Sequence, residues 1–326
     1  MGTSDDPDHV VRRLVPEALL ERIGAGDEVF VVTGATGWFG TATLHILDLA
    51  LGASSGERLL AYAATGRPVT LRSGRVVEVR PLSDLPEHPP AAAPVCMLHF
   101  AYLMRHLAAE LGHDEFVRGN RAITDTAVRA LRAVRPASFA FASSGAVHRP
   151  GGGIVDDLEH DPYATLKHRD EVRFEQTCRE VGARCVLGRI YSVGGPFMPD
   201  RDRFVLGDLV DRTVRGGPLV IRARHELWRS YVGLGDVLAV LIAESLDGTD
   251  PLVRFDTGGD VVEAEELAAR VRTVLGAPEI VIERDPDPAL APDRYVGAGA
   301  TFEALARRHR VPLTPLDDQI RQVARA

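Results

Sequence analysis

Short, mostly apolar runs alternate with stretches of helical character through the first two thirds of the chain. Such runs indicate buried strands, and they occupy residues 29–32, 59–64, 95–100, 138–144 and 184–190. Helices are expected between them over 41–51, 114–134 and 161–182. Strands that alternate with helices predict an α/β fold built on a doubly wound parallel sheet.

The pattern changes at both ends of this region. Residues 1–8 are expected to be disordered, and residues 9–24 are expected to form a short amphipathic helix, with a break near Pro16, at the edge of the domain. Beyond residue 190 the sequence predicts a short strand at 219–221, a strand at 252–255 that rejoins the first sheet, and helices at 204–214, 236–246, 262–275, 301–309 and 315–325. The predicted organisation is an N-terminal extension (1–28), a parallel-sheet domain (29–190) and a smaller lobe (191–326), with residues 233–258 returning to the first domain.

The composition excludes several classes of partner. Lys and Arg number 38 against 46 Asp and Glu, so the net charge of −8 argues against general affinity for nucleic acids or acidic membranes. No apolar run approaches the length of about 18 residues that a membrane span requires. The N-terminus is acidic and lacks the apolar region of a secretory signal. Three cysteines without metal-ligand spacing fit a reducing cytoplasm.

A glycine-rich turn follows the first strand and precedes the first long helix. Gly34, Gly37 and Gly40 are spaced G-x-x-G-x-x-G. Amides at a helix N-terminus lack intrahelical partners and attract anions, and glycines let a pyrophosphate approach the backbone closely. A turn with chance glycines is the alternative, but this position favours a dinucleotide site in a Rossmann fold. The expected cofactor contacts are Gly34, Thr36, Gly37, Trp38, Phe39, Gly40, Phe100 and Ala101.

The end of the second strand bears on which nicotinamide cofactor is used. In dinucleotide folds an acidic residue there binds the adenosine ribose, whereas a basic residue accommodates a 2′-phosphate. Residues 64–67 contain no acid, and Arg67 is the nearest charge. NADP is therefore favoured over NAD, with a solvated turn role for Arg67 as the alternative.

Ser144, Tyr163 and Lys167 form the constellation that carries chemistry. Tyr163 and Lys167 are four residues apart, so on a helix they share a face. A nearby ammonium lowers the pKa of a phenol, and a serine hydroxyl can hold the substrate oxygen. Tyr163 would then exchange a proton at that oxygen while hydride passes between the adjacent carbon and a nicotinamide. Lys167 can also bind the cofactor ribose.

These motifs resemble those of the extended short-chain dehydrogenase/reductases, and in particular the NAD-dependent epimerase/dehydratase family, which modifies nucleotide sugars. The resemblance also includes Leu98–Ala101, Ser143–Val147, Gly188–Pro196 and Arg229–Val232, and so spans most of the chain from residue 29. It implies a Rossmann domain, a smaller lobe that binds the nucleotide sugar, and dimerisation through the helices near 114–134 and 162–182.

The resemblance also implies substrate-binding residues. Arg229 would grip the substrate diphosphate, for which a guanidinium fork is suited, and Arg294 is a second candidate. A surface ion pair is the alternative role for Arg229. Ser192 stands where the family usually has an asparagine that contacts the substrate.

Other positions depart from the family pattern. Tyr102 replaces a small residue near the expected cofactor pyrophosphate, and His148 replaces a tyrosine. Dehydratases carry an acidic pair directly after the catalytic hydroxyl residue. Gly145 and Ala146 occupy those positions here, which argues against a 4,6-dehydratase.

The sequence therefore predicts an NAD(P)-dependent epimerase or keto-reductase that acts on a nucleotide-linked sugar, with Tyr163 as acid/base. An NADPH-dependent reductase of a non-nucleotide carbonyl metabolite is the alternative, motivated by Ser192. A non-catalytic NADP-binding regulator is a third hypothesis, which the intact Ser144, Tyr163 and Lys167 set disfavours. The expected protein is a cytoplasmic homodimer.

Overall fold

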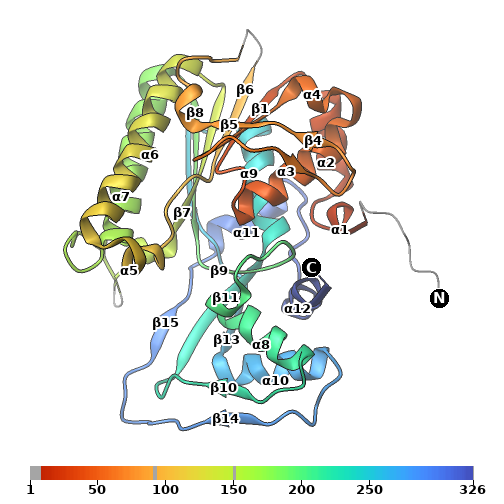
Figure 1. The fold of residues 1–326 in the computed structure, drawn as a ribbon, viewed down its shortest axis with the longest axis vertical. Coiled ribbons are helices and arrows are strands. Elements are labelled where there is room, and N and C mark those ends of the chain that lie inside the picture. The colour runs from red at the N-terminus through yellow and green to blue at the C-terminus, as the bar shows by residue number, and fades with distance from the viewer. Residues whose placement is uncertain (1–8, 91–93, 150–151, 326) are drawn as a thin grey trace.

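A seven-stranded parallel sheet is the centre of the molecule, in the order β12-β8-β7-β6-β1-β2-β5 (Figure 1). The computed structural model describes residues 9–90, 94–149 and 152–325, so the expected disorder of 1–8 lies outside it. The strands are β1 (Val29–Thr33), β2 (Leu59–Ala63), β5 (Val79–Pro81), β6 (Val95–His99), β7 (Ser138–Ser144), β8 (Arg184–Ile190) and β12 (Leu252–Asp256). The predicted doubly wound α/β fold is confirmed.

The strand order reverses beside β1, whose neighbours are β2 on one side and β6 on the other. In open α/β sheets, ligands bind at the carboxyl ends of the strands at such a switch point. The glycine-rich turn leaves β1 at this point, so the fold places it where a dinucleotide would lie.

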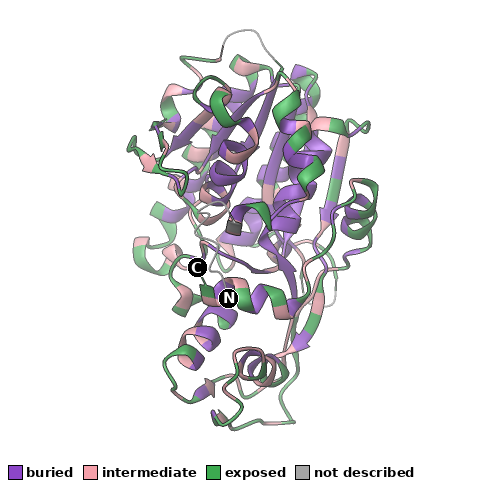
Figure 2. Ribbon diagram, turned by 90° about the vertical axis from the view of Figure 1, so that its right-hand side faces the viewer, coloured by how far each residue is buried: buried purple, intermediate pink, exposed green. Residues whose placement is uncertain are grey.

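Helices cover both faces of the sheet. One face is covered by four helices that contact one another in series: α2 (Glu17–Ala25), α3 (Trp38–Leu51), α9 (Leu234–Asp247) and α11 (Ala300–Arg308). The other face is covered by α6 (His113–Val134) and α7 (Pro162–Val181). Figure 2 shows buried residues concentrated along the strands and on the helix faces turned toward them.

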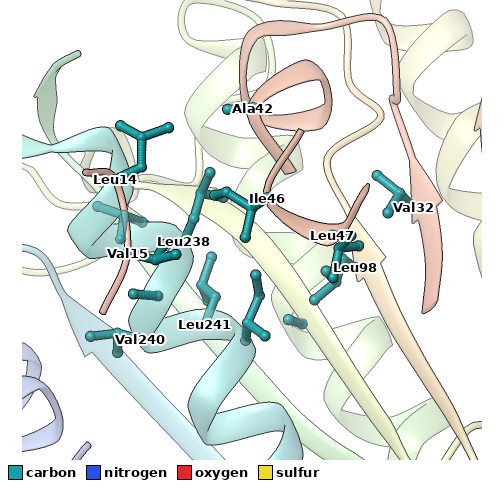
Figure 3. Packing of buried hydrophobic residues seen from close by; sticks show 14 of the residues in the cluster. Leu14, Val15, Val32, Ala42, Ile46, Leu47, Leu98, Leu238, Val240 and Leu241 are labelled. Atoms are coloured by element: carbon teal, nitrogen blue, oxygen red, sulfur yellow. The ribbon is translucent and has the colours of Figure 1, made fainter. Parts of the chain in front are cut away.

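Helix α9 is the most deeply buried helix of the described chain, with apolar side chains around most of its circumference. A helix that is apolar all round belongs inside a core. Leu238 and Leu241 of α9 pack with Ile46 and Leu47 of α3 in the same apolar cluster (Figure 3). This packing fixes α3, and with it the glycine turn, against the sheet.

The N-terminal segment is helical with the predicted break near Pro16. It forms two helices, α1 (His9–Arg12) and α2, and Pro16 precedes the first turn of α2. Leu14 and Val15 are buried in the cluster that contains α9. The segment therefore belongs to the helical layer rather than to the domain edge.

The smaller lobe has a four-stranded mixed sheet, shown below the parallel sheet in Figure 1. Its strands are β9 (Ser192–Gly194), β11 (Leu227–Gly233), β13 (Asp260–Glu263) and β15 (Asp293–Tyr295). A second pair joins β10 (Leu219–Ile221) to β14 (Ile282–Arg284). The helices α8 (Val205–Val214), α10 (Ala264–Val274) and α12 (Leu316–Arg325) complete its core.

Smaller elements connect these layers. A hairpin of β3 (Val69–Thr70) and β4 (Val76–Val77) forms around Gly74. The remaining short helices are α4 (Ser55–Arg58), α5 (Leu107–Leu111) and 3₁₀ turns at Gly52–Ser54, Leu82–Asp84, Gly145–Val147 and Arg201–Arg203. Among the described residues, no helix has the length and apolar character needed to cross a membrane.

Candidate active site

The glycine turn is compact because two glycines are packed against backbone. Gly34 has φ of +70°, in the left-handed region that favours glycine, and a Cβ there would lie 2.5 Å from the Ala101 amide nitrogen. A Cβ on Gly40 would collide with the Gly34 carbonyl oxygen. Helix α3 begins at Trp38, earlier than the sequence predicts, with Gly37 as a cap residue that offers no side chain.

The first turn of α3 fits a dinucleotide. Amides at this position have no partner within the helix, and α3 has no acidic residue in its first turn to repel an anion. Gly37 is exposed, and Thr36, Trp38 and Phe39 are half-buried, so the turn is accessible. Phe39 packs against Phe100 with ring centroids 5.8 Å apart, which brings the two predicted cofactor segments together.

Ser144, Tyr163 and Lys167 come together at the carboxyl end of β7. Ser144 is the last residue of β7, and Tyr163 and Lys167 lie in the first turns of α7, where the Asp161 side chain accepts from the Ala164 amide. Their exposures are only 6%, 8% and 4%, respectively. The three side chains therefore form a buried candidate site for proton transfer.

Two neighbours of Tyr163 favour its ionised form. Burial raises the pKa of Tyr163, and a hydrogen bond with Ser144 and the positive charge of Arg105 oppose this rise. The Arg105 guanidinium lies 5.1 Å from the centroid of the Tyr163 ring and pairs with Asp161 at 3.1 Å. Lys167 donates to the Ala142 carbonyl at 2.8 Å.

A second phenol reaches Ser144 from the smaller lobe. The Tyr295 hydroxyl oxygen lies 3.2 Å from Ser144 Oγ and donates to the Ile190 carbonyl at 3.2 Å. With that donation made, the Ser144 hydroxyl is the donor to Tyr295. Tyr191 packs against the Tyr295 ring with centroids 4.6 Å apart. Tyr295 is therefore part of the site, although the sequence analysis did not identify it.

The predicted substrate-binding arginines lie on opposite sides of β11 and β15. Arg229 donates to the Asp293 carboxylate and to the Trp228 carbonyl, both at 2.8 Å, and lies 5.8 Å from the Tyr295 ring centroid. Arg294 lies 5.0 Å from the Trp228 ring centroid. Because successive strand residues point to opposite faces, Arg294 faces away from the side that holds Tyr295.

Two other predicted site residues have less defined surroundings. Ser192 is half-buried on β9, opposite Tyr231 of β11, at the join of the two sheets. Arg67 is exposed directly after β2, in a stretch where residues 64–68 are all exposed. The structure thus brings together the catalytic candidates and Arg229, but not Arg294.

A comparison with family models decides the family. The model described as the NAD dependent epimerase/dehydratase family matches residues 30–247. The chain belongs to this family. The match covers the glycine turn, Ser144, Tyr163, Lys167 and Arg229, so this epimerase/dehydratase-family enzyme carries the family's sequence pattern across both parts of the fold.

Solved structures share its fold at low sequence identity. An epimerase from Methanothermobacter thermautotrophicus has 16% identity and a TM-score of 0.72, over 95% of each chain. UDP-glucose 4-epimerase from Thermotoga maritima, solved with UDP-glucose, has 18% identity and a TM-score of 0.68, over 91% of this chain and 97% of that one. RMD from Pseudomonas aeruginosa, complexed with NADPH, has 19% identity and a TM-score of 0.68, over 92% and 98%. No curated protein matches the sequence.

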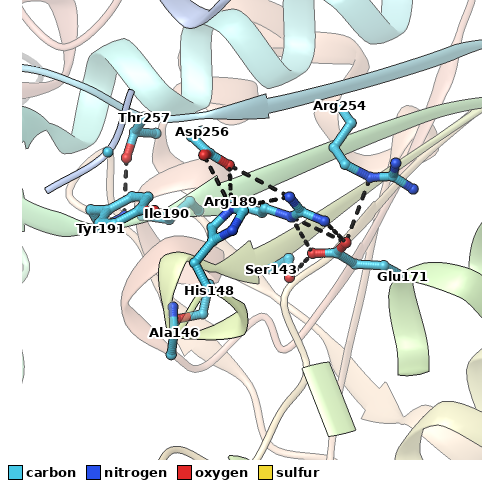
Figure 4. Close-up of polar contacts among 12 residues, drawn as sticks. Ser143, Ala146, His148, Glu171, Arg189, Ile190, Tyr191, Arg254, Asp256 and Thr257 are labelled. Atoms are coloured by element: carbon cyan, nitrogen blue, oxygen red, sulfur yellow. Dashed lines mark hydrogen bonds and ion pairs between the residues drawn. The ribbon is translucent and has the colours of Figure 1, made fainter. Parts of the chain in front are cut away.

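A largely buried ionic network includes Ser143, the residue before Ser144 in β7 (Figure 4). The Glu171 carboxylate accepts from Ser143 Oγ at 2.6 Å and from Arg189 at 2.8 Å. Arg189 also contacts His148 at 3.1 Å, and His148 lies 3.2 Å from Asp256. Residues from β7, α7, β8 and β12 are tied together by these contacts. His148 is therefore held by Arg189 and Asp256. The described residues contain no cluster that could hold a metal ion.

The packing of Gly40 gives a direct test of the cofactor turn. Gly40→Ala is expected to cost about 1–3 kcal/mol in unfolding free energy, because backbone atoms must move to admit the methyl group, and to weaken NADH and NADPH binding. Gly56→Ala is the matched control, since a Cβ there meets nothing within 4 Å. Thermal unfolding and cofactor-fluorescence titrations measure both effects. Cofactor affinity equal to that of the unmodified protein would contradict the assignment of the turn.

Proposed function

We propose that this enzyme is an NAD(P)-dependent epimerase or keto-reductase of a nucleotide-linked sugar, with Tyr163 as acid/base. The observation that carries the proposal is the burial of Ser144, Tyr163 and Lys167 together beside the glycine turn. Structures with similar folds include complexes with UDP-glucose, NAD and NADPH, which supports this class of ligands.

In the proposed mechanism, each side chain has a separate task. With substrate bound, the Ser144 hydroxyl would turn from Tyr295 to donate its hydrogen bond to the substrate oxygen and orient it toward Tyr163. The Tyr163 phenol transfers a proton at that oxygen, and burial keeps water from competing for it. The glycine turn and Lys167 would hold the nicotinamide cofactor, which supplies hydride transfer at the neighbouring carbon.

We propose NADP as the preferred cofactor, with NAD as the alternative. No acidic residue follows β2, and the exposed Arg67 is available to a 2′-phosphate. A thermal-shift series with NAD and NADP separates the two, because a ligand that binds only the native state raises its stability by mass action.

The substrate end of the site is proposed to bind a diphosphate through Arg229. The Asp293 carboxylate now holds this guanidinium, so an incoming diphosphate must compete with it. The same ion pair favours the second candidate function, reduction of a non-nucleotide carbonyl metabolite, because it leaves Arg229 already neutralised. A non-catalytic regulator is disfavoured, since the three catalytic candidates are all in place.

UDP binding separates these two functions. Arg229→Ala is expected to weaken UDP binding by about tenfold or more, since a charge-assisted hydrogen bond contributes roughly 1.5–3 kcal/mol, and Asp293→Asn is expected to strengthen it. Arg294→Ala removes the same charge from the opposite face and serves as the control. Thermal-shift titration with UDP measures all three variants. An unchanged affinity in Arg229→Ala would favour the non-nucleotide substrate.

The proposed cofactor-binding and substrate-binding parts are residues 29–190 and 191–326, with residues 233–258 returning to the cofactor-binding part. A homodimer in the cytoplasm is also proposed, with α6 and α7 as the interface. Exposed ion pairs within the chain, such as Arg132–Glu180 and Arg173–Asp125, join α6 to α7. Light scattering at several salt concentrations tests the homodimer, because surface ion pairs are screened by salt.

A further inference from the structure

The Lys167 ammonium lies between two aromatic rings. Its nitrogen is 3.7 Å from the centroid of Tyr102 and 4.6 Å from that of Phe141. Its hydrogen bond to the Ala142 carbonyl completes these close contacts. An ammonium over the face of an aromatic ring is attracted by the ring quadrupole, more strongly when water is excluded. Tyr102 is the nearer of the two rings.

Burial makes this attraction matter, because it lowers the pKa of Lys167 and so favours loss of the charge. Asp170 and Glu171 on α7 oppose this effect. However, burial also raises the pKa of Asp170, and Glu171 is paired with Arg189. The other titratable groups nearby are His99 on β6, whose pKa is lowered to about 3 by burial and by Lys167, and Arg105 and Tyr163, which contact each other. The Tyr102 ring is thus a close, fixed source of stabilisation for the cation.

The segment that carries Tyr102 is held in place by the neighbouring helices. The Asn120 side chain of α6 accepts from the Leu103 amide at 2.8 Å and donates to the Leu103 carbonyl at 3.4 Å. Arg105 anchors the other end on Asp161, the cap of α7. The Tyr102 ring also meets Tyr163 edge-to-face, with centroids 5.8 Å apart. Tyr102 therefore contacts both catalytic candidates of α7.

We propose that Tyr102 is a positioning residue whose ring holds the protonated Lys167 ammonium beside Tyr163. What this contact does for the cofactor and for Tyr163 rests on the proposed function. The contact itself is a property of the folded chain. The ring carries the effect, whereas the buried hydroxyl, which has no hydrogen-bond partner among the described residues, does not.

A double-mutant cycle without cofactor tests the contact. Unfolding equilibrium constants are measured by urea denaturation for Tyr102→Leu, Lys167→Met and the double variant, because the cycle cancels the separate cost of losing each side chain. At about pH 6 the expected coupling is about 5- to 30-fold. It should fall as the pH rises and Lys167 loses its proton. A cycle with Tyr102→Phe in place of Tyr102→Leu should show no coupling beyond about twofold, because the phenylalanine ring keeps the interaction.

Additive effects in the Tyr102→Leu cycle at about pH 6, or equal coupling for leucine and phenylalanine, would overturn the proposal.

A second measurement follows NADPH binding against pH by cofactor fluorescence. The midpoint at which affinity falls should move down by about one pH unit in Tyr102→Leu, stay in place in Tyr102→Phe, and vanish in Lys167→Met. An unmoved midpoint in Tyr102→Leu also contradicts the proposal. Failure of the unmodified protein to bind any nicotinamide cofactor would contradict the proposed function instead, and the cofactor-free cycle would still decide the role of Tyr102.

Discussion

Tyr163→Phe is expected to reduce kcat by about 10²–10⁴-fold, the usual contribution of a positioned general acid or base. The phenylalanine ring preserves the contacts with Tyr102 and Arg105, so the loss should come from the missing proton and not from altered packing. Cofactor affinity and the unfolding free energy should change little. The measurement is turnover of a panel of UDP- and dTDP-sugars with NAD and NADP.

The matched control is Tyr62→Phe. Tyr62 is 1% exposed in β2, away from Ser144 and Lys167 in the sheet order, so its hydroxyl should be dispensable for turnover. If Tyr163→Phe retained the turnover of the Tyr62→Phe variant, Tyr163 would not be the acid/base. The residual proton donor to examine would then be Tyr295, whose hydroxyl also reaches Ser144.

The parts of the fold that could be predicted are those whose signals are local. Strands β1 and β6 are buried apolar runs, and the glycine spacing and the Tyr163–Lys167 interval each lie within a few residues. A buried parallel sheet produces such runs because both of its faces are covered. The family resemblance extended these local signals to most of the chain from residue 29.

The parts that could not be predicted depend on distant contacts. Tyr295 approaches Ser144 across 151 positions of sequence, from a three-residue strand whose residues are exposed or half-buried. Arg105 lies in an irregular segment, where no periodicity indicates that it reaches Tyr163. Its contact with the Tyr163 ring therefore depends on the folded chain.

Glu171 is another residue that only the structure reveals, and its replacement has the largest expected effect on stability. Glu171→Ala is expected to cost about 3–5 kcal/mol, because it leaves the guanidinium of Arg189 buried without its main counter-charge. The side chains of Glu171 and Arg189 are only 1% and 12% exposed, so water cannot easily replace the lost partner. Urea denaturation followed by circular dichroism measures the unfolding free energy.

Two further variants separate the desolvation cost from ordinary loss of a contact. Glu180→Ala breaks a pair with Arg132 whose side chains are 41% and 57% exposed, so it should cost less than about 1 kcal/mol. The double variant Glu171→Leu with Arg189→Met should be more stable than Glu171→Ala alone, since it removes both buried charges. Equal losses in Glu171→Ala and Glu180→Ala would show that the network contributes no more than a surface pair. A large loss limited to Glu171→Ala would mean that the stability of the fold depends on the pairing of this buried carboxylate, one turn beyond Lys167.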